Sequence, residues 1–463
     1  MKFIVLNGSP KGPVSVTMQY IHFLQKRFPE HNFEMFHVAQ RIRKIENDEN
    51  TFREIIEKIK NADAVVWAFP LYVYLVHAHY KRFIELIFER NAAESFANKY
   101  TVIFSTSIKF YDITAHSYIH AVCDDLNMKV AGAYTADMPD LTKEKERKRL
   151  TQFAEHVFQV IDGKQPVQPQ YSPLNWRKFA YKPADVEKPV STRKKRIVLV
   201  SDAKAEDINL NGMIQRFQAS FAEDIKVINL HELSIKGSCR GCLKCGYNFE
   251  CFYDGKDDYR QFWEEELETA DIIVIAGTIR DRYLSSLWKC FFDRRFFHTH
   301  TPRLMGKQIV YLISGPLSQI PNLRMILEAY MELEMANVVG FISDEFGDSQ
   351  DIDSLISNRT ADAVHFSVEK YIRPETFLGV AARKLFRDEV YGRLRMVFQA
   401  DYREYKKLGL FDFPQKKIRL RMLNGITGIL LKIPIIRNFF QGFMKQGMIM
   451  SHQRILKKLY PEE

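Results

Sequence analysis

The chain contains 463 residues, of which 46% are apolar and 27% are charged. These fractions match those of globular proteins and exclude a chain that is disordered along its whole length, and the length predicts two to four domains rather than one. Four of the six Cys residues fall within residues 239–251, a grouping unlike a secreted disulfide scaffold, which predicts a reducing cytoplasm. The apolar run at residues 3–6 is too short for an export signal.

The net charge of +10 is concentrated at the C-terminal end. Residues 371–463 contain 19 Lys and Arg against 8 Asp and Glu, whereas the rest of the chain contains 48 against 49. A nucleic-acid-binding protein would need a basic face on a recognisable binding fold. The body of the chain offers neither, so we expect no nucleic-acid partner.

Short apolar runs alternate with longer stretches of helical period along residues 1–370. The runs are rich in β-branched and aromatic residues, which is typical of strands buried on both faces of a parallel sheet. They occur at residues 3–6, 64–69, 101–105, 197–200, 272–276 and 309–313. The alternation predicts the α/β class, with doubly wound parallel sheets that bind ligands at the carboxyl ends of their strands.

The second half of this pattern repeats the first. Ala62-Asp63-Ala64-Val65-Val66 recurs 208 positions later as Ala270-Asp271-Ile272-Ile273-Val274, and Lys81 and Lys289 are separated by the same interval. The repeat predicts a tandem duplication, and five prolines between residues 166 and 189 predict a linker. The predicted organisation is a first domain at 1–163, a linker at 164–195, a second domain at 196–370 and a basic helical extension at 371–463.

The loop after the first predicted strand has the chemistry of a phosphate cradle. It reads Asn7-Gly8-Ser9-Pro10-Lys11-Gly12, and Ser15 and Thr17 follow at the start of a helix. The free N–H groups and the dipole of a helix N-terminus attract an anion, and the hydroxyls add donors. The loop is neither a Walker A motif nor a dinucleotide fingerprint, and an ordinary strand-to-helix turn is the alternative.

These residues, with Pro70-Leu71-Tyr72 and Lys81-Arg82-Phe83, resemble the flavodoxin-like NADPH-dependent FMN reductases, and most of all their iron–sulfur flavoprotein branch. The resemblance covers both copies and implies two tandem flavodoxin-like domains, bound FMN and NAD(P)H as substrate. The implied contacts to the FMN phosphate come from Ser9, Lys11, Ser15 and Thr17, and those to its ring from Pro70, Tyr72, Tyr74, Ser105 and Ser107. Because the flavin carries out the redox chemistry itself, no catalytic side chain is assigned.

The second copy lacks a phosphate-compatible loop. At the equivalent position it reads Ser201-Asp202-Ala203-Lys204-Ala205-Glu206-Asp207, which contains no glycine and three carboxylates. Carboxylates would repel a phosphate. We therefore expect one FMN per chain, bound by the first copy.

The second copy instead carries four closely spaced thiols, Cys239, Cys242, Cys245 and Cys251. The spacing indicates a compact metal centre, and its resemblance to the iron–sulfur flavoprotein motif implies a 4Fe–4S cluster. Structural zinc, which usually joins two Cys pairs across a longer stretch, and thiols without a metal are the alternatives. Because each copy keeps what the other lacks, we expect an internal pseudo-dimer in which the four Cys lie near Tyr72.

The basic extension contains a predicted amphipathic helix that opens at Pro434. Its apolar residues, Ile435, Ile436, Phe439, Phe440, Phe443 and Met444, share an arc of about 140°. Arg437, Gln441 and Lys445 lie opposite. A helix of this kind is compatible with peripheral contact with the inner face of the membrane, and equally with packing against the protein or a partner. The longest charge-free stretch in this part, residues 422–431, is too short to span a bilayer.

Together these features predict an FMN-dependent NAD(P)H oxidoreductase that passes electrons between a nicotinamide or reduced carrier, FMN and a 4Fe–4S cluster. A simple flavin or quinone reductase without a cluster is one alternative. A non-catalytic flavodoxin-type electron carrier or adaptor at the membrane surface is another. The electron acceptor is not identified by the sequence, and a homo-oligomer is compatible with it.

Overall fold

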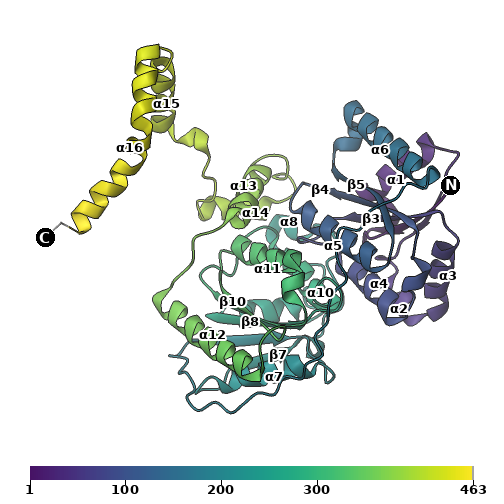
Figure 1. Ribbon diagram of the computed structural model, residues 1–463, viewed down its shortest axis with the longest axis horizontal. Helices are drawn as coiled ribbons and strands as arrows, with labels where there is room; N and C mark the ends of the chain where they lie inside the picture. Colours follow the sequence, from purple (N-terminus) through teal and green to yellow (C-terminus); the bar gives the residue numbers. More distant parts are fainter. Residues whose placement is uncertain (461–463) are drawn as a thin grey trace. The chain divides into compact units, whose positions relative to one another are not determined.

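The computed structural model describes residues 1–460, apart from the side chain of Lys445. It divides the chain into two compact units, residues 1–404 and the part from Tyr405 onward. The first unit contains two parallel five-stranded sheets with helices on both faces (Figure 1). We call the parts built on the first and second sheets the first and second domains.

The two sheets have the same strand order, which confirms the predicted α/β doubly wound class. The first is β2-β1-β3-β4-β5 and the second, read in the same sense, is β7-β6-β8-β9-β10, with every pair parallel. The first sheet comprises β1 (Lys2–Asn7), β2 (Asn32–Phe36), β3 (Ala64–Pro70), β4 (Tyr100–Ser107) and β5 (Lys129–Asp137). The second comprises β6 (Ile197–Ser201), β7 (Lys226–Asn229), β8 (Ile272–Thr278), β9 (Gln308–Ser314) and β10 (Asn337–Ser343).

Helices cover the two faces of each sheet because successive residues of a buried strand point to opposite sides. Phe3 and Val5 of β1 belong to a core shared with α1 and α6, whereas Trp67 of β3 packs on Tyr80 of α4 on the other face. The first domain has α1 (Val16–Arg27), α2 (Ile42–Asn47), α3 (Glu49–Lys60), α4 (Ala78–Glu89), α5 (Asp112–Asp125) and α6 (Glu144–Asp162). The second has α7 (Ile208–Ala219), α8 (Cys245–Asn248), α9 (Tyr259–Phe262), α10 (Ser286–Arg294), α11 (Pro321–Leu333) and α12 (Ser349–Glu369).

The two domains exchange helix caps through α4 and α10. A carboxylate oxygen of Asp293, on α10, accepts a hydrogen bond from the backbone N–H of Ala78 at the start of α4 (2.8 Å). In return, Glu85 on α4 accepts one from the N–H of Ser286 at the start of α10 (2.6 Å). A carboxylate is favourable at a helix N-terminus. The reciprocal pattern is that of an isologous interface, in which each side gives what it receives.

Buried lysines complete this interface. Lys81 lies 2.8 Å from Glu85 on its own helix and 3.0 Å from Asp281 of the second domain, and all three side chains are buried. Lys289, one repeat interval later, pairs with Asp293 and donates to the carbonyl of Tyr72 in the first domain (3.0 Å). The charges therefore hold α4 and α10 in one register.

The proline-rich segment between the domains follows the surface of both. The backbone N–H groups of Gln170 and Tyr171 donate to Asp124 of the first domain, each at 2.9 Å. Farther along, the buried hydroxyl of Tyr181 donates to Asp353 of the second. The segment is therefore a strap anchored at both ends.

The first compact unit continues past residue 370, where the sequence places the start of the extension. Helix α13 (Phe377–Tyr391) packs against α11, and Phe386 and Val390 are buried. Helix α14 (Gln399–Lys407) begins with a turn in which Asp401 is fully buried and accepts a hydrogen bond from Thr301 (2.9 Å). Residues 377–404 are therefore packed structure.

The second unit contains α15 (Ile418–Leu430) and α16 (Pro434–Leu459), and Pro434 opens α16 as predicted. Its large apolar side chains are exposed, with Ile435 at 81% and Phe439 at 77%. Among the described residues, no helix is long and apolar enough to cross a membrane.

Candidate active site

A cavity of about 330 Å³ lies at the carboxyl edge of the first sheet, where the loops after β1, β3 and β4 meet. Eight of the nine residues predicted to contact FMN line it: Ser9, Lys11, Ser15, Thr17, Pro70, Tyr72, Tyr74 and Ser107. Ser105 is buried instead, with its hydroxyl 2.6 Å from Nε2 of His116. Thr106, which the sequence reasoning passed over, lines the cavity.

Hydrogen bonds within the loop between β1 and α1 shape this loop for an anion. The fully buried Asn7 accepts from the N–H of Ser9 (3.0 Å) and donates to the carbonyl of Gly12 (3.0 Å), which ties the two ends of the loop together. Ser15 caps α1, accepting from the N–H of Met18 (3.3 Å). The first N–H groups of a helix have no intrahelical partner, so the start of α1 offers donors where the hydroxyls of this loop gather.

The glycines of this loop serve packing and turn geometry. A Cβ on Gly8 would lie 2.7 Å from the ring of Tyr80 and 2.9 Å from Phe69. Gly12 has φ +60, in the left-handed region that favours glycine. Gly8 is therefore needed for close approach to α4 and β3, a reason that the motif alone does not reveal.

The loop after β3 turns sharply and contacts the second domain. Val73 and Tyr74 have φ +35 and +64, and the N–H groups of Tyr72 and Leu75 donate to each other's carbonyls. The buried hydroxyl of Tyr74 donates to the carbonyl of Ala329 on α11 (3.0 Å). The ring of Tyr74 therefore lines the cavity while its hydroxyl anchors the loop.

The Cys loop of the second domain lies against these first-domain loops. Gly241, with φ +62, is so close to Tyr72 that a Cβ there would overlap the tyrosine hydroxyl, and it would stand 3.1 Å from Cε of Lys11. Burial, together with the nearby thiols Cys239 and Cys242, raises the pKa of Tyr72 well above its usual value. Cys239, Gly241 and Tyr72 all line the 330 Å³ cavity.

A buried histidine joins the two loops. Nδ1 of His77 accepts the N–H of His79 (3.1 Å), so the proton is on Nε2, which donates to the carbonyl of Cys239 (2.8 Å). Burial lowers the pKa of His77 well below its usual value, so the ring is neutral. This residue positions the Cys loop and was assigned no role from sequence.

The four cysteines surround a single small space. Cys239, Cys242, Cys245 and Cys251 line a cavity of about 20 Å³, which is room for about one water molecule. Burial raises the pKa of Cys239 to about 12 and also raises those of Cys245 and Cys251. Within residues 1–460, no group of three His, Cys, Asp or Glu side chains is arranged to hold a metal ion. Four thiols could ligate a cluster or zinc or stay free of metal, but a space of this size does not hold a cluster.

Arg295 is a cation that the sequence reasoning missed. It lines the cavity and is 3% exposed, so its charge is shielded from water. It donates to the carbonyls of Thr299 (2.7 Å) and Thr301 (2.5 Å) and pairs with Glu334. No motif marks it, because it reaches the cavity only through the packing of the second domain on the first.

Comparison with known proteins assigns the first domain. Residues 1–139 match the model of the family described as NADPH-dependent FMN reductase, and no curated protein matches the chain. Similar solved structures include an NADH:FMN oxidoreductase in its apo form (15% identity, 34% of this chain and 87% of that chain, TM-score 0.29). Another is an FMN-dependent NADH-azoreductase from Bacillus anthracis in complex with FMN (14% identity, 36% of this chain and 100% of that chain, TM-score 0.26). A third is an oxidoreductase from Corynebacterium diphtheriae (14% identity, 35% of this chain and 98% of that chain, TM-score 0.30). The match therefore places an NADPH-dependent FMN reductase domain at residues 1–139 and supports an NAD(P)H-dependent flavin oxidoreductase.

Proposed function

We propose that the chain binds one FMN in the 330 Å³ cavity and uses it to oxidise NAD(P)H. The observation that carries this proposal is the convergence of eight predicted contact residues, from the loops after three strands and the start of α1, on one cavity. Its volume falls in the range of small-molecule sites. The bound flavin would supply the hydride chemistry.

The residues around the cavity have separable tasks in this proposal. Ser9, Ser15 and Thr17 supply hydroxyl donors for the phosphate, and Lys11 and the start of α1 supply positive charge. Thr17 shares a hydrogen bond with Thr106 (2.7 Å), which fixes its hydroxyl. The phosphate is thereby held at one end of the cavity and the ring at the other.

The second domain closes the ring end. Phe296, Thr299 and His300 line the cavity opposite Tyr72, and they exclude water from a bound ring. Arg295 stays charged because its carboxylate partner raises its pKa against the opposing effect of burial.

The second domain is proposed to hold no flavin of its own. Where a phosphate would bind, Asp202 is buried and accepts a hydrogen bond from Ser285, and Arg280 pairs with Asp207 (2.7 Å). These carboxylates stand where an anion would have to bind, and they would repel it. The common strand order and the shared Lys81–Lys289 interval support the inference that the two domains arose by duplication.

The test of the main proposal is flavin stoichiometry and retention. Wild-type protein should carry one FMN per chain, Ser9→Asp should lose it because a carboxylate repels the phosphate, and the control Ser9→Ala should bind more weakly without losing it. Two FMN per chain, or full retention in a correctly folded Ser9→Asp variant, would contradict the proposal. Folding of each variant is checked by far-UV circular dichroism.

We also propose a 4Fe–4S cluster on the four cysteines as a separable feature. It is supported by the convergence of the four thiols on one cavity beside Tyr72, and its binding requires that cavity to widen. Iron and sulfide should be present after anaerobic purification and should be lost in Cys242→Ser, while Cys123→Ser, a buried cysteine elsewhere, keeps them. Absence of iron and sulfide from anaerobically reconstituted protein would contradict this proposal.

Peripheral membrane contact is proposed for the second unit. Residues 413–460 contain ten Lys and Arg and no Asp or Glu, and they expose the apolar side chains of α15 and α16. Full-length protein should sediment with vesicles that contain anionic lipid and should be released by salt. Protein lacking residues 415–463 should stay in the supernatant and keep its flavin; loss of flavin on this deletion would instead indicate that the segment packs on the protein.

A further inference from the structure

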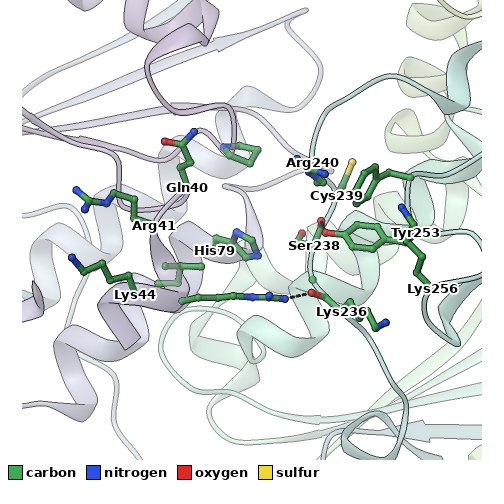
Figure 2. A pocket seen from close by; sticks show the side chains of 15 residues that line it. Gln40, Arg41, Lys44, His79, Lys236, Ser238, Cys239, Arg240, Tyr253 and Lys256 are labelled. Carbon is green, nitrogen blue, oxygen red and sulfur yellow. Dashed lines mark hydrogen bonds between the residues drawn. The ribbon is translucent and has the colours of Figure 1, made fainter. Parts of the chain in front are cut away.

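A second cavity, larger than the proposed flavin cavity, also borders the Cys loop. It has a volume of about 840 Å³ and is formed between the two domains (Figure 2). One wall comes from Pro10, residues 40–44 and His79 of the first domain, and the other from residues 236–240, Phe252, Tyr253 and Lys256 of the second. Cys239 lines both this cleft and the flavin cavity.

The cleft is strongly cationic. Six of its fifteen lining residues are Lys or Arg and none is Asp or Glu; the six, which define the basic cleft, are Arg41, Arg43, Lys44, Lys236, Arg240 and Lys256. Figure 2 labels five of them, Arg41 and Lys44 on one wall and Lys236, Arg240 and Lys256 on the other. Like charges collected around a concave space repel one another, so the arrangement costs stability unless an anion enters.

The missing carboxylates distinguish this cleft from the rest of the domain interface. The interface cations Lys81 and Lys289 each pair with a buried carboxylate. Within the described residues, none of the six cations of the basic cleft forms an ion pair. Their excess charge is therefore available to a ligand.

Internal contacts hold several of these cations in place. Arg240 and Lys256 lie over the ring of Phe252, at 4.1 and 3.8 Å from its centre. Arg43 donates to the carbonyl of Lys236 and so links the two walls. A cation held on an aromatic ring loses less side-chain entropy when a ligand binds.

We propose that the basic cleft binds a small molecule that carries two or more phosphate or carboxylate groups, at a site separate from the flavin cavity. The volume lies within the range of about 300–1,000 Å³ that is usual for small-molecule sites, and domain interfaces are common places for them. The concave shape favours a small polyanion over a protein surface. This inference goes beyond the proposed flavin chemistry and does not depend on it.

The experiment is calorimetric titration of the full chain, in the presence of saturating FMN, with inorganic pyrophosphate and separately with citrate. Binding of pyrophosphate alone identifies a phosphate site, binding of citrate alone a carboxylate site, and binding of both a site for oxyanions in general. Arg41→Ala/Lys44→Ala should weaken binding at least tenfold, as should Lys256→Ala on the opposite wall. These side chains are exposed, so their removal leaves the fold intact.

A charge-matched control removes two exposed lysines of α6, in Lys145→Ala/Lys148→Ala, and should bind as wild type does. The proposal is overturned if neither anion binds at millimolar concentration. It is equally overturned if the control variant weakens binding as much as Arg41→Ala/Lys44→Ala, because the attraction would then belong to the whole protein and not to the cleft.

Discussion

Replacing Gly241 by alanine tests the contact between the Cys loop and the loop after β3, which carries Tyr72. The added Cβ would overlap the hydroxyl of Tyr72, and the residue has φ +62, a conformation that L-residues adopt at a cost. Two penalties are therefore expected, one from the backbone conformation and one from the collision. Only the second depends on the packing of the two domains.

Gly255 separates these penalties. It has φ +69 and lies near the same loop, but nothing lies within 4 Å of its added Cβ. Gly255→Ala should therefore lower the free energy of unfolding by only about 1–2 kcal/mol, the usual cost of a left-handed residue with a side chain. Gly241→Ala should cost about 1–3 kcal/mol more, the usual range for overpacking a close contact.

Removing the hydroxyl should relieve the collision. In Gly241→Ala/Tyr72→Phe the nearest remaining atoms are Cε of Lys11 at 3.1 Å and Cζ of the ring at 3.5 Å, distances that small shifts can accommodate. The double variant should therefore recover most of the extra loss, and the cycle should give a favourable coupling of about 1–2 kcal/mol.

The assay is urea unfolding followed by tryptophan fluorescence and by far-UV circular dichroism on the same samples, because coincident curves justify a two-state treatment. FMN affinity is measured in parallel and should fall with Gly241→Ala but not with Gly255→Ala. Equal losses of stability in the two alanine variants, or no recovery by Tyr72→Phe, would refute the contact between the loops.

Three further predictions concern charge and ligand. Burial raises the pKa of Asp202 from 3.8 to about 6, so the folded state holds a proton that the unfolded state releases between these values, and stability is lost as pH rises through 6. Asp202→Asn should therefore raise the free energy of unfolding by about 3 kcal/mol at pH 8, with the gain vanishing toward pH 4; a pH-independent difference in urea titrations would contradict it. Lys81→Met should cost about 3–5 kcal/mol because Glu85 and Asp281 stay buried without this cation, whereas Lys58→Met, which removes an exposed pair, should leave the urea midpoint close to that of the wild type. Equal urea midpoints for these two variants would show that the buried cation is not needed. Finally, removal of FMN by dialysis against a chaotrope should lower the melting temperature, and added FMN should restore it in a concentration-dependent way; a melting temperature indifferent to FMN would contradict flavin binding to the folded state.

The parallel sheets were predictable because their strands are continuous apolar runs. The predicted strands at 64–69 and 101–105 became Ala64–Pro70 and Tyr100–Ser107. Because carboxyl ends of neighbouring parallel strands share one edge, the loops after them also had to meet. The sequence could not tell which residues at the end of a strand reach the cavity. Ser105 faces His116 inside the domain, although Ser107, two residues later, lines the cavity. Strand alternation does not indicate where the exposed end begins.

The second wall of the cavity was not predictable in the same way. Arg295, Phe296 and His300 follow α10, and their place opposite Tyr72 depends on how α10 packs against α4. That packing is a long-range consequence of buried charges, and no local periodicity encodes it. The charge balance of residues 371–463 likewise could not show that part of the extension is packed. Residues 377–404 lie within it and contain the buried side chains of Phe386 and Asp401.

The reciprocal caps also explain why one domain can lose its own ligand site without losing its place in the molecule. Glu85 and Asp293 act at helix N-termini that lie in the α4–α10 interface. The loop after β6 supplies neither cap carboxylate, although its Asp202 accepts a hydrogen bond from Ser285 at the start of α10. Substitutions in that loop that keep this acceptor therefore leave the two caps in place, while the residues that follow α10 stay in position against the first domain. Under the proposed function, a second domain without a flavin of its own would thus still form a wall of the cavity in the first.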